Sequence, residues 1–207
     1  MSDKKSSYQI PSGTASSEQL ISKSRFIAAV SHAGDKNEAM SFIKRISASH
    51  PGAHHNTYAF IIGSPEGSSD TGYSDDGEVS GCAGKPILSI LQHKAVGDVA
   101  AVVTRYYGGT KLGTGGLVRA YSGTLMLALD KLRLIERVPM ITLSIEFPYQ
   151  FESPLRHLFE KYGIGFNDPV YTDEVTLRAN LPEDKAELIK NEIMNLTRGQ
   201  ARIEKTS

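Results

Sequence analysis

The chain has 207 residues, 40% of them hydrophobic, which is enough for one large domain or two small ones with a sizeable core. Lysine plus arginine and aspartate plus glutamate number 23 each, so the net charge is zero, and any basic surface for nucleic acid must be local. The sequence has no apolar run long enough to cross a membrane, no signal-peptide pattern at its start, and one cysteine, Cys82, which predicts a cytoplasmic protein without a membrane partner.

The first part of the chain alternates strand and helix patterns. We expect residues 1 to about 17 to be polar and mobile, and a strand or a hairpin pair to follow, with its clearest part over 26–32. Apolar residues at helical spacing predict a helix over 35–49, with Asp35 as its N-cap. A β-branched and aromatic run predicts a strand over 56–62, and a Gly/Ser/Asp-rich loop over 64–74.

An acidic turn, Ser-Asp-Asp-Gly-Glu at 74–78, precedes a helix with Pro86 in its first turn. The run 99–103 is β-branched and small, as in a strand buried on both faces. A glycine-rich segment at 108–116 follows, and then an amphipathic helix to about residue 132 with Thr114 as a candidate N-cap.

The glycine-rich segment has two interpretations that the sequence leaves open. Gly113, Gly115 and Gly116 leave backbone N–H groups bare at a helix start, and such a start attracts anions. Arg105, Lys111 and Arg119 would add positive charge, so the segment could seat a phosphate or carboxylate. Alternatively, the glycines only permit a tight turn with positive φ and close packing.

The last third of the chain has a different pattern. A polar hinge at 136–139 predicts a boundary between domain 1–137 and domain 138–207. Strand, helix, strand, strand, helix and strand patterns then follow over 141–147, 154–162, 164–171, 175–181, 183–196 and 200–204, with Gly163 and Gly199 as C-caps. This is the split βαβ, or ferredoxin-like, order, and the chain as a whole is predicted to be α+β.

Standard nucleotide signatures are absent. At Gly84-Lys85 the P-loop would need a glycine where Val79 stands and a hydroxyl residue where Pro86 stands, and the dinucleotide fingerprint would need a glycine or alanine at Val118. A buried structural role is expected for Cys82 rather than that of a nucleophile. Metal binding by the acidic turn with one histidine is a weaker interpretation than turn chemistry, so we expect neither a metal nor a cofactor.

Nucleic-acid binding is the alternative that the interleaved basic and aromatic residues favour, because phosphates and unpaired bases use this combination. The predicted anion or nucleic-acid site consists of Arg105, Tyr106, Lys111, Gly113, Gly115, Gly116 and Arg119, with Tyr107 as an alternative stacking residue. A possible accessory polar site consists of His54, His55, Asp75, Asp76 and Glu78. The opposing interpretation is that Tyr121 and one of Tyr106 and Tyr107 are core residues and that the arginines pair with the acidic turn.

Four segments resemble the IMPACT family, in its bacterial YigZ-type branch. They are Ala53-His54-His55, Ser74-Asp75-Asp76-Gly77-Glu78, Gly81-x-Ala83-Gly84-Lys85-Pro86, and the hallmark segment from Arg105 to Tyr121. Val79 and Cys82 depart from the family pattern, where proline and often threonine stand. The resemblance implies an N-terminal α/β domain similar to the second domain of a small-subunit ribosomal protein and to domain IV of elongation factor G. It also implies a C-terminal ferredoxin-like domain similar to domain V of that factor.

Those relatives touch ribosomal RNA, and eukaryotic IMPACT proteins regulate translation by competing for an activator of an initiation-factor kinase. A bacterial chain has no such kinase system. The resemblance therefore implies an RNA or ribosome partner, or a protein partner in the translation machinery, with RNA affinity that falls steeply with salt. The alternatives are an enzyme that acts on a small anionic or phosphorylated substrate and a protein–protein module with a broad apolar patch.

Overall fold

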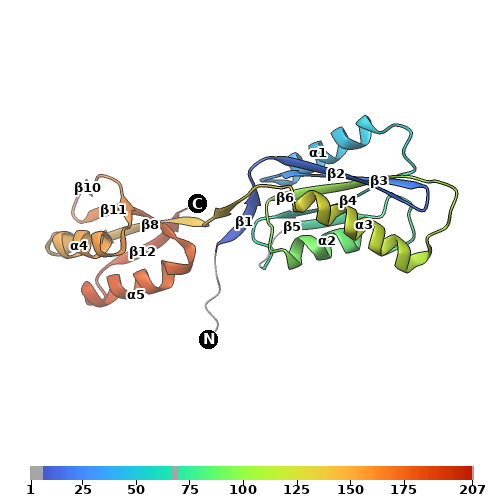
Figure 1. Ribbon diagram of the computed structural model, residues 1–207. Helices are drawn as coiled ribbons and strands as arrows, with labels where there is room; N and C mark the ends of the chain where they lie inside the picture. The colour runs from blue at the N-terminus through green and yellow to red at the C-terminus, as the bar shows by residue number, and fades with distance from the viewer. Residues whose placement is uncertain (1–6, 67–69, 207) are drawn as a thin grey trace. The chain divides into compact units, whose positions relative to one another are not determined.

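The computed structural model describes residues 7–66 and 70–206 of this mixed α+β protein. The chain divides into two compact units (Figure 1). We call them the N-terminal unit, Tyr8–Arg137, and the C-terminal unit, which contains the chain from Val138 onward.

The N-terminal unit is built on a five-stranded antiparallel sheet with the order β2-β3-β6-β4-β5. Its strands are β2 (Thr14–Ile21), β3 (Ser24–His32), β6 (Val99–Tyr106), β4 (His55–Ile62) and β5 (Asp70–Ser74). The central strand β6 is buried along almost its whole length, as its β-branched and small side chains predict.

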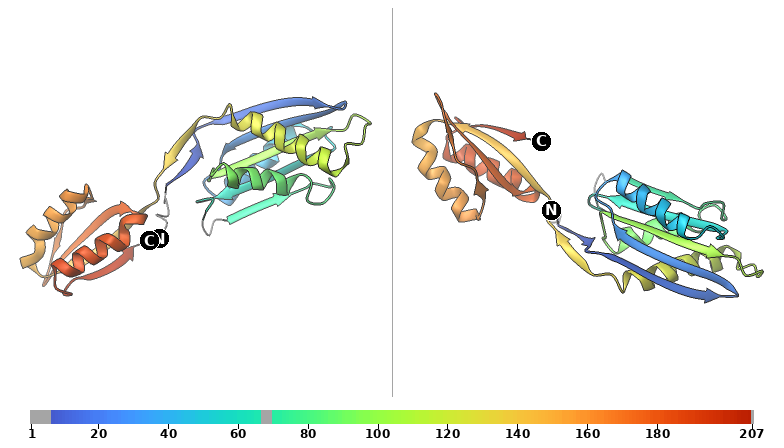
Figure 2. Two further views of the ribbon diagram at one scale, coloured as in Figure 1. Left: turned by 60° about the horizontal axis from the view of Figure 1, so that its bottom comes forward. Right: turned by 90° about the horizontal axis from the view of Figure 1, so that it is seen from above.

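Helices cover both faces of this sheet (Figure 2). α1 (Lys36–Ser49) packs on one face, and α2 (Gly84–His93) and α3 (Gly113–Leu129) pack on the other. Asp35 accepts a hydrogen bond from the Glu38 N–H and is the N-cap of α1, which confirms the sequence prediction. The glycine-rich segment therefore connects the central strand to the start of α3.

A short ribbon of β1 (Tyr8–Pro11) and β7 (Leu134–Arg137) joins the two ends of the N-terminal unit. Asp98 is buried beside it and accepts hydrogen bonds from the Tyr8 hydroxyl, the Gly63 N–H and Arg137. Burial, and then the hydrogen bond to Asp98, raise the pKa of Tyr8 to about 12. One carboxylate thus fixes the ribbon to the sheet.

Two expectations for this unit were wrong. The segment predicted to be mobile contains β1 and the first half of β2, and residues 1–6 lie outside the described residues. β2 is an edge strand with Thr14, Ser16, Glu18 and Leu20 exposed, and its buried Ser17 is polar and donates to the Thr124 carbonyl, so apolar alternation is absent there. The predicted loop at 64–74 ends in strand β5, which pairs with β4, and residues 67–69 lie outside the described part of the chain.

The C-terminal unit has one antiparallel sheet with the order β10-β11-β8-β12, and β9 also pairs with β11. Its strands are β8 (Met140–Phe147), β9 (Gly165–Phe166), β10 (Val170–Tyr171), β11 (Val175–Pro182) and β12 (Arg202–Thr206). The helices are α4 (Glu152–Tyr162) and α5 (Ala186–Leu196), and their apolar faces form a core with alternate residues of β8 and β11.

The predicted element order is present in this unit, with differences at the ends of elements. Gly163 is the left-handed C-cap of α4, as predicted, whereas α5 is capped by Thr197 and Gly199 lies two residues further on with φ of +77°. The single strand expected over 164–171 is two short strands, β9 and β10, separated by a segment that contains Pro169.

Candidate functional site

The first carboxylate of the acidic turn, Asp75, is held by backbone N–H groups. The Asp75 carboxylate accepts hydrogen bonds of 2.8–3.0 Å from the N–H groups of Gly81, Ala83 and Gly84. Ala83, the N-cap residue of α2, offers no capping side chain, so Asp75 caps this helix from outside. Its role is structural.

Asp76 is also held by the backbone. Its carboxylate accepts from the Asn56 N–H, and its carbonyl accepts from Nδ1 of His55 at 2.8 Å. Its φ of +44°, followed by +77° at Gly77, makes the tight turn that Asp-Gly favours. Among the residues that the structure describes, no three or more His, Cys, Asp or Glu side chains are grouped to hold a metal ion.

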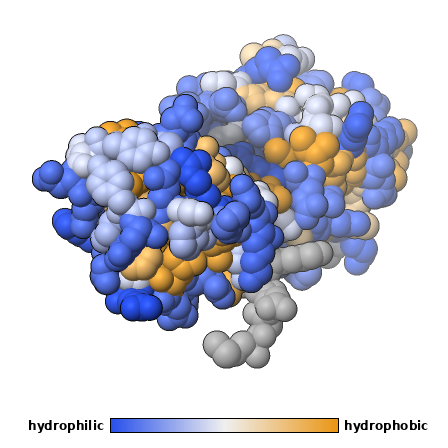
Figure 3. Space-filling model, turned by 90° about the vertical axis from the view of Figure 1, so that its left-hand side faces the viewer, coloured by the Kyte–Doolittle hydropathy of each residue, from blue (hydrophilic) through white to orange (hydrophobic). Residues whose placement is uncertain are grey.

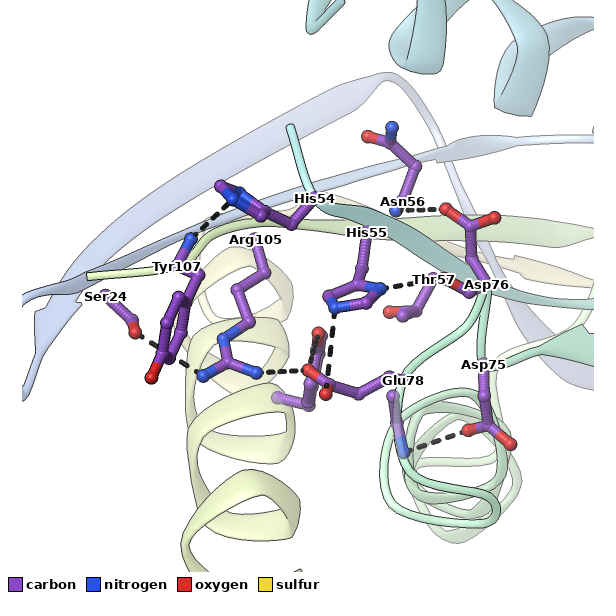
Figure 4. Close-up of polar contacts among 12 residues, drawn as sticks. Ser24, His54, His55, Asn56, Thr57, Asp75, Asp76, Glu78, Arg105 and Tyr107 are labelled. Carbon is purple, nitrogen blue, oxygen red and sulfur yellow. Dashed lines mark hydrogen bonds and ion pairs between the residues drawn. The ribbon is translucent and has the colours of Figure 1, made fainter. Parts of the chain in front are cut away.

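Glu78 is the carboxylate of the turn that meets an arginine (Figure 4). Its Oε2 accepts from Nη1 of Arg105 and, at 2.9 Å, from the hydroxyl of Tyr121, while Oε1 lies 3.8 Å from Nε2 of His55. The Glu78 and Arg105 side chains are 7% and 5% exposed. Burial, reinforced by the neighbouring carboxylate, raises the pKa of Tyr121 well above its ordinary value, so its hydroxyl remains a donor.

Arg105 is a buried structural residue. Its guanidinium lies between the rings of Phe26 and Tyr107, 5.4 and 5.3 Å from their centroids, and donates to Ser24, while its Nε is buried without a partner in the described residues. The positive charge of Arg105, which the sequence predicted to bind an anion, is paired with Glu78 instead. For this arginine the structure favours the interpretation that it pairs with the acidic turn.

A pocket of about 580 Å³ lies beside this ion pair, at the start of α3. His55, Glu78 and Arg105 line one part of it, and Tyr107, Lys111 and Gly113 line another. The remaining wall consists of Val79, Leu112, Thr114 and Leu117. The pocket therefore combines polar groups with an apolar wall, as small-molecule and nucleotide sites do.

The pocket has a net positive character. Glu78 and Arg105 neutralise each other, and no carboxylate forms an ion pair with Lys111 or Arg119 in the part of the chain that the structure describes. α3 begins at Gly113, and its cap residue Leu112 makes no side-chain hydrogen bond. Thr114 lies inside the helix, so its predicted role as N-cap is wrong. The positive end of the helix thus faces the pocket without a capping side chain.

Of the two candidate stacking tyrosines, Tyr107 and not Tyr106 lines the pocket. Tyr106 is half-buried, hydrogen-bonds to Nδ1 of His50, and does not line the pocket. Tyr107 lines the pocket and is 40% exposed, and its N–H donates to Nδ1 of His54. The two adjacent histidines therefore serve different contacts, since His55 faces Glu78.

The glycines of the loop are under different structural constraints. A Cβ at Gly108 would lie 1.9 Å from the Lys23 carbonyl oxygen, and Gly109 and Gly113 have φ of +86° and +69°. Gly116 packs tightly on Leu112, because a Cβ there would approach the Leu112 Cβ to 3.1 Å. Gly115 has neither constraint: its φ is not positive, and a Cβ would lie 3.6 Å from Nη1 of Arg119. That distance also places the Arg119 guanidinium beside the first turn of α3.

Cys82 is buried at 7% exposure, and its side chain does not line the pocket. Its N–H donates to the Val79 carbonyl within the turn that leads to α2. This position agrees with the buried, structural role that the sequence predicts.

These features define a two-unit α+β protein with a cationic pocket on a glycine-rich strand–helix connection. The family description "Impact N-terminal domain" matches residues 22–129, and "Domain of unknown function (DUF1949)" matches residues 145–200. The chain belongs to the IMPACT family. It is 35% identical to IMPACT family member YigZ of Escherichia coli over 95% of this chain and 97% of that one. It is 33% identical to IMPACT family member YvyE of Bacillus subtilis over 90% of this chain and 85% of that one.

Among solved structures, one described as a crystal structure of a hypothetical protein is 34% identical and covers 97% of this chain and 98% of its own, with a TM-score of 0.67. No helix among the described residues is long and apolar enough to span a membrane.

Proposed function

We propose that this protein binds RNA through the pocket at the start of α3, and that it acts in the cytoplasm as a regulator of translation on the ribosome or an RNA of the translation machinery. The observation that carries the proposal is the pocket itself. Lys111 stands there unpaired within the described residues, together with an uncapped helix start and the exposed ring of Tyr107. Phosphate contacts and base stacking use this combination.

The topology supports the translational part of the proposal. We infer that the C-terminal unit is ferredoxin-like, because its strand order β10-β11-β8-β12 corresponds to the split βαβ arrangement. We also infer that the units correspond to the domains predicted over 1–137 and 138–207. The basis for an RNA partner is the likeness that the family resemblance implies, of the N-terminal domain to a ribosomal-protein domain and domain IV of elongation factor G, and of the C-terminal domain to domain V of that factor. A fold by itself hosts many functions.

Lys111→Ala is expected to weaken binding of a single-stranded RNA about 5- to 30-fold at low salt, because a charge-assisted contact to phosphate contributes about 1–2 kcal/mol. Arg119→Ala is expected to act in the same direction, since its guanidinium lies beside Gly115. Lys44→Ala is the matched control, because Lys44 is exposed on α1, across the sheet from the pocket. Equal affinities for all three variants and the parent protein in fluorescence anisotropy would refute the proposal.

The salt dependence is expected to be shallower than the sequence suggests. Since Arg105 is paired, two cations are left for phosphates, Lys111 in the pocket and Arg119 outside its lining. At about −0.7 for each phosphate of a single strand, the slope of log affinity against log salt is expected to be about −1.4. Lys111→Ala is expected to remove about half of that slope.

Gly115→Ala separates binding from folding. A methyl group at this position meets no close neighbour, so unfolding stability is expected to rise by up to about 1 kcal/mol, as for glycine in a helix. RNA binding is expected to weaken, because the methyl group covers N–H groups at the helix start. Gly123→Ala on the same helix is the matched control, with the same stability effect and unchanged binding. If Gly115→Ala binds RNA as well as Gly123→Ala and the parent protein do, the start of α3 does not contact RNA.

A second candidate, an enzyme for a small phosphorylated substrate, is favoured by one observation: His55 and Glu78 line the same pocket as Lys111. However, Glu78 is engaged by Arg105 and Tyr121, and Asp75 and Asp76 accept from backbone groups. Hydrolysis of p-nitrophenyl phosphate that is lost in His55→Ala would select this candidate over RNA binding.

A protein–protein module would need a broad apolar surface. On the face of the molecule drawn in Figure 3, apolar residues lie in separate areas among hydrophilic ones. Exposed apolar side chains such as Leu20, Met126 and Val170 come from different elements. This distribution favours the pocket over a broad docking face as the functional site.

A further inference from the structure

The size and charge of the pocket limit what it can hold. A volume of about 580 Å³ lies within the range of about 300–1,000 Å³ that small-molecule and cofactor sites occupy. Of the charged side chains that line it, Glu78 and Arg105 are paired with each other and Lys111 is not paired within the described residues. One uncompensated cation and one helix start match one phosphate rather than a row of them.

The ring of Tyr107 is held in place before any ligand arrives (Figure 4). The backbone N–H of Tyr107 donates to Nδ1 of His54, and the His54 ring meets the Tyr107 ring edge-on, with 6.1 Å between their centroids. The guanidinium carbon of Arg105 lies over the Tyr107 ring, 5.3 Å from its centroid. Arg105 is itself fixed by Glu78, so the order of the ring depends on the buried ion pair. A pre-positioned ring that remains 40% exposed can stack on a base with little loss of side-chain entropy.

The rest of the wall is suited to a base or ribose edge. Val79, Leu112 and Leu117 supply apolar contact, and Val79 is 49% exposed. A base within a duplex is stacked on both sides and cannot enter a pocket of this kind, whereas an unpaired base can. The pocket thus combines one phosphate position, one stacking ring and one apolar wall.

We propose that this pocket takes a single unpaired nucleotide of an RNA strand, with its base on the Tyr107 ring and its phosphate at Lys111 and the start of α3. The inference rests on the proposed RNA binding and narrows it to single-stranded RNA. It assigns a stacking role to Tyr107 and a positioning role to the Glu78–Arg105 pair, which holds that ring from behind. Duplex RNA is excluded from the pocket.

The test compares two probes on the full chain at low salt: a fluorescein-labelled oligouridylate of about 12 nucleotides and the same strand annealed to oligoadenylate. Single-stranded RNA is expected to bind, and the duplex to bind at least about tenfold more weakly. Tyr107→Leu is expected to lose about 5- to 150-fold in affinity for the single strand, since stacking contributes about 1–3 kcal/mol per base. Tyr107→Phe is expected to bind within about twofold of the parent protein, because it keeps the ring.

Tyr149→Leu is the matched control, because Tyr149 is 51% exposed in the C-terminal unit and does not line the pocket; its affinity is expected to be unchanged. Equal binding of single strand and duplex, with no effect of Tyr107→Leu, would overturn this inference while RNA binding itself stands. Absence of binding to either probe would overturn the proposed function as well. Thermal unfolding of each variant shows that it is folded.

Discussion

Replacement of Glu78 by alanine is expected to destabilise the N-terminal unit by about 3–5 kcal/mol, because it leaves the buried Arg105 guanidinium without its counter-ion. The Arg105 side chain is 5% exposed, and its Nε already has no partner among the described residues. Tyr121 would also lose the acceptor for its buried hydroxyl. Native-state hydrogen exchange of the β6 amides measures this loss within the unit itself.

The control for this variant is Glu18→Ala. Glu18 also binds an arginine, Arg25, through two hydrogen bonds, but its side chain is 52% exposed. An exposed pair of this kind contributes little to stability, because solvent screens it. If Glu78→Ala costs no more than Glu18→Ala, the buried pair is not what holds the pocket wall, and the positioning role of Arg105 fails with it.

Replacement of Asp75 by alanine is expected to lower stability by about 2–3 kcal/mol, because one carboxylate satisfies three N–H groups at the start of α2. Asp35→Ala on α1 is the matched control, since Asp35 caps with a single N–H contact, to Glu38, and its loss is expected to cost about 1 kcal/mol. Hydrogen exchange at Ile87 and Leu91 in α2, compared with Phe42 in α1, measures both effects. Equal losses of stability in the two variants would contradict the capping of α2 by Asp75.

Local patterns were sufficient to predict much of the fold. The apolar run of β6, the helical spacing of α1 and its cap Asp35, and the element order of the C-terminal unit each depend on residues close in sequence. The edge strand β5 was missed, and β2 was expected only as an unplaced partner in a hairpin, because many of their residues face solvent and leave little periodicity. The Gly, Ser and Asp residues before and within β5 are also typical of loops.

The candidate site was predicted as a segment but not as a set of contacts. Of the predicted site residues, Arg105, Lys111 and Gly113 line the pocket, whereas Gly115, Gly116 and Arg119 lie on α3 outside its lining. The sequence does not determine whether the acidic turn meets an arginine. Asp75 and Glu78 are only three residues apart, yet Asp75 faces backbone N–H groups and Glu78 faces Arg105. Nor could the sequence choose between Tyr106 and Tyr107, because Tyr106 is the last residue of β6 and Tyr107 follows the strand, so the end of the strand decides which ring reaches the pocket.

The central claim is that RNA binds at the start of α3, and amide chemical-shift mapping of the ¹⁵N-labelled full chain with the oligouridylate probe tests it most directly. The account predicts the largest shifts at Tyr107, Lys111 and Gly113 to Gly116, with Gly123 on the same helix little changed. Shifts confined to the C-terminal unit, or no shifts at low salt, would contradict it.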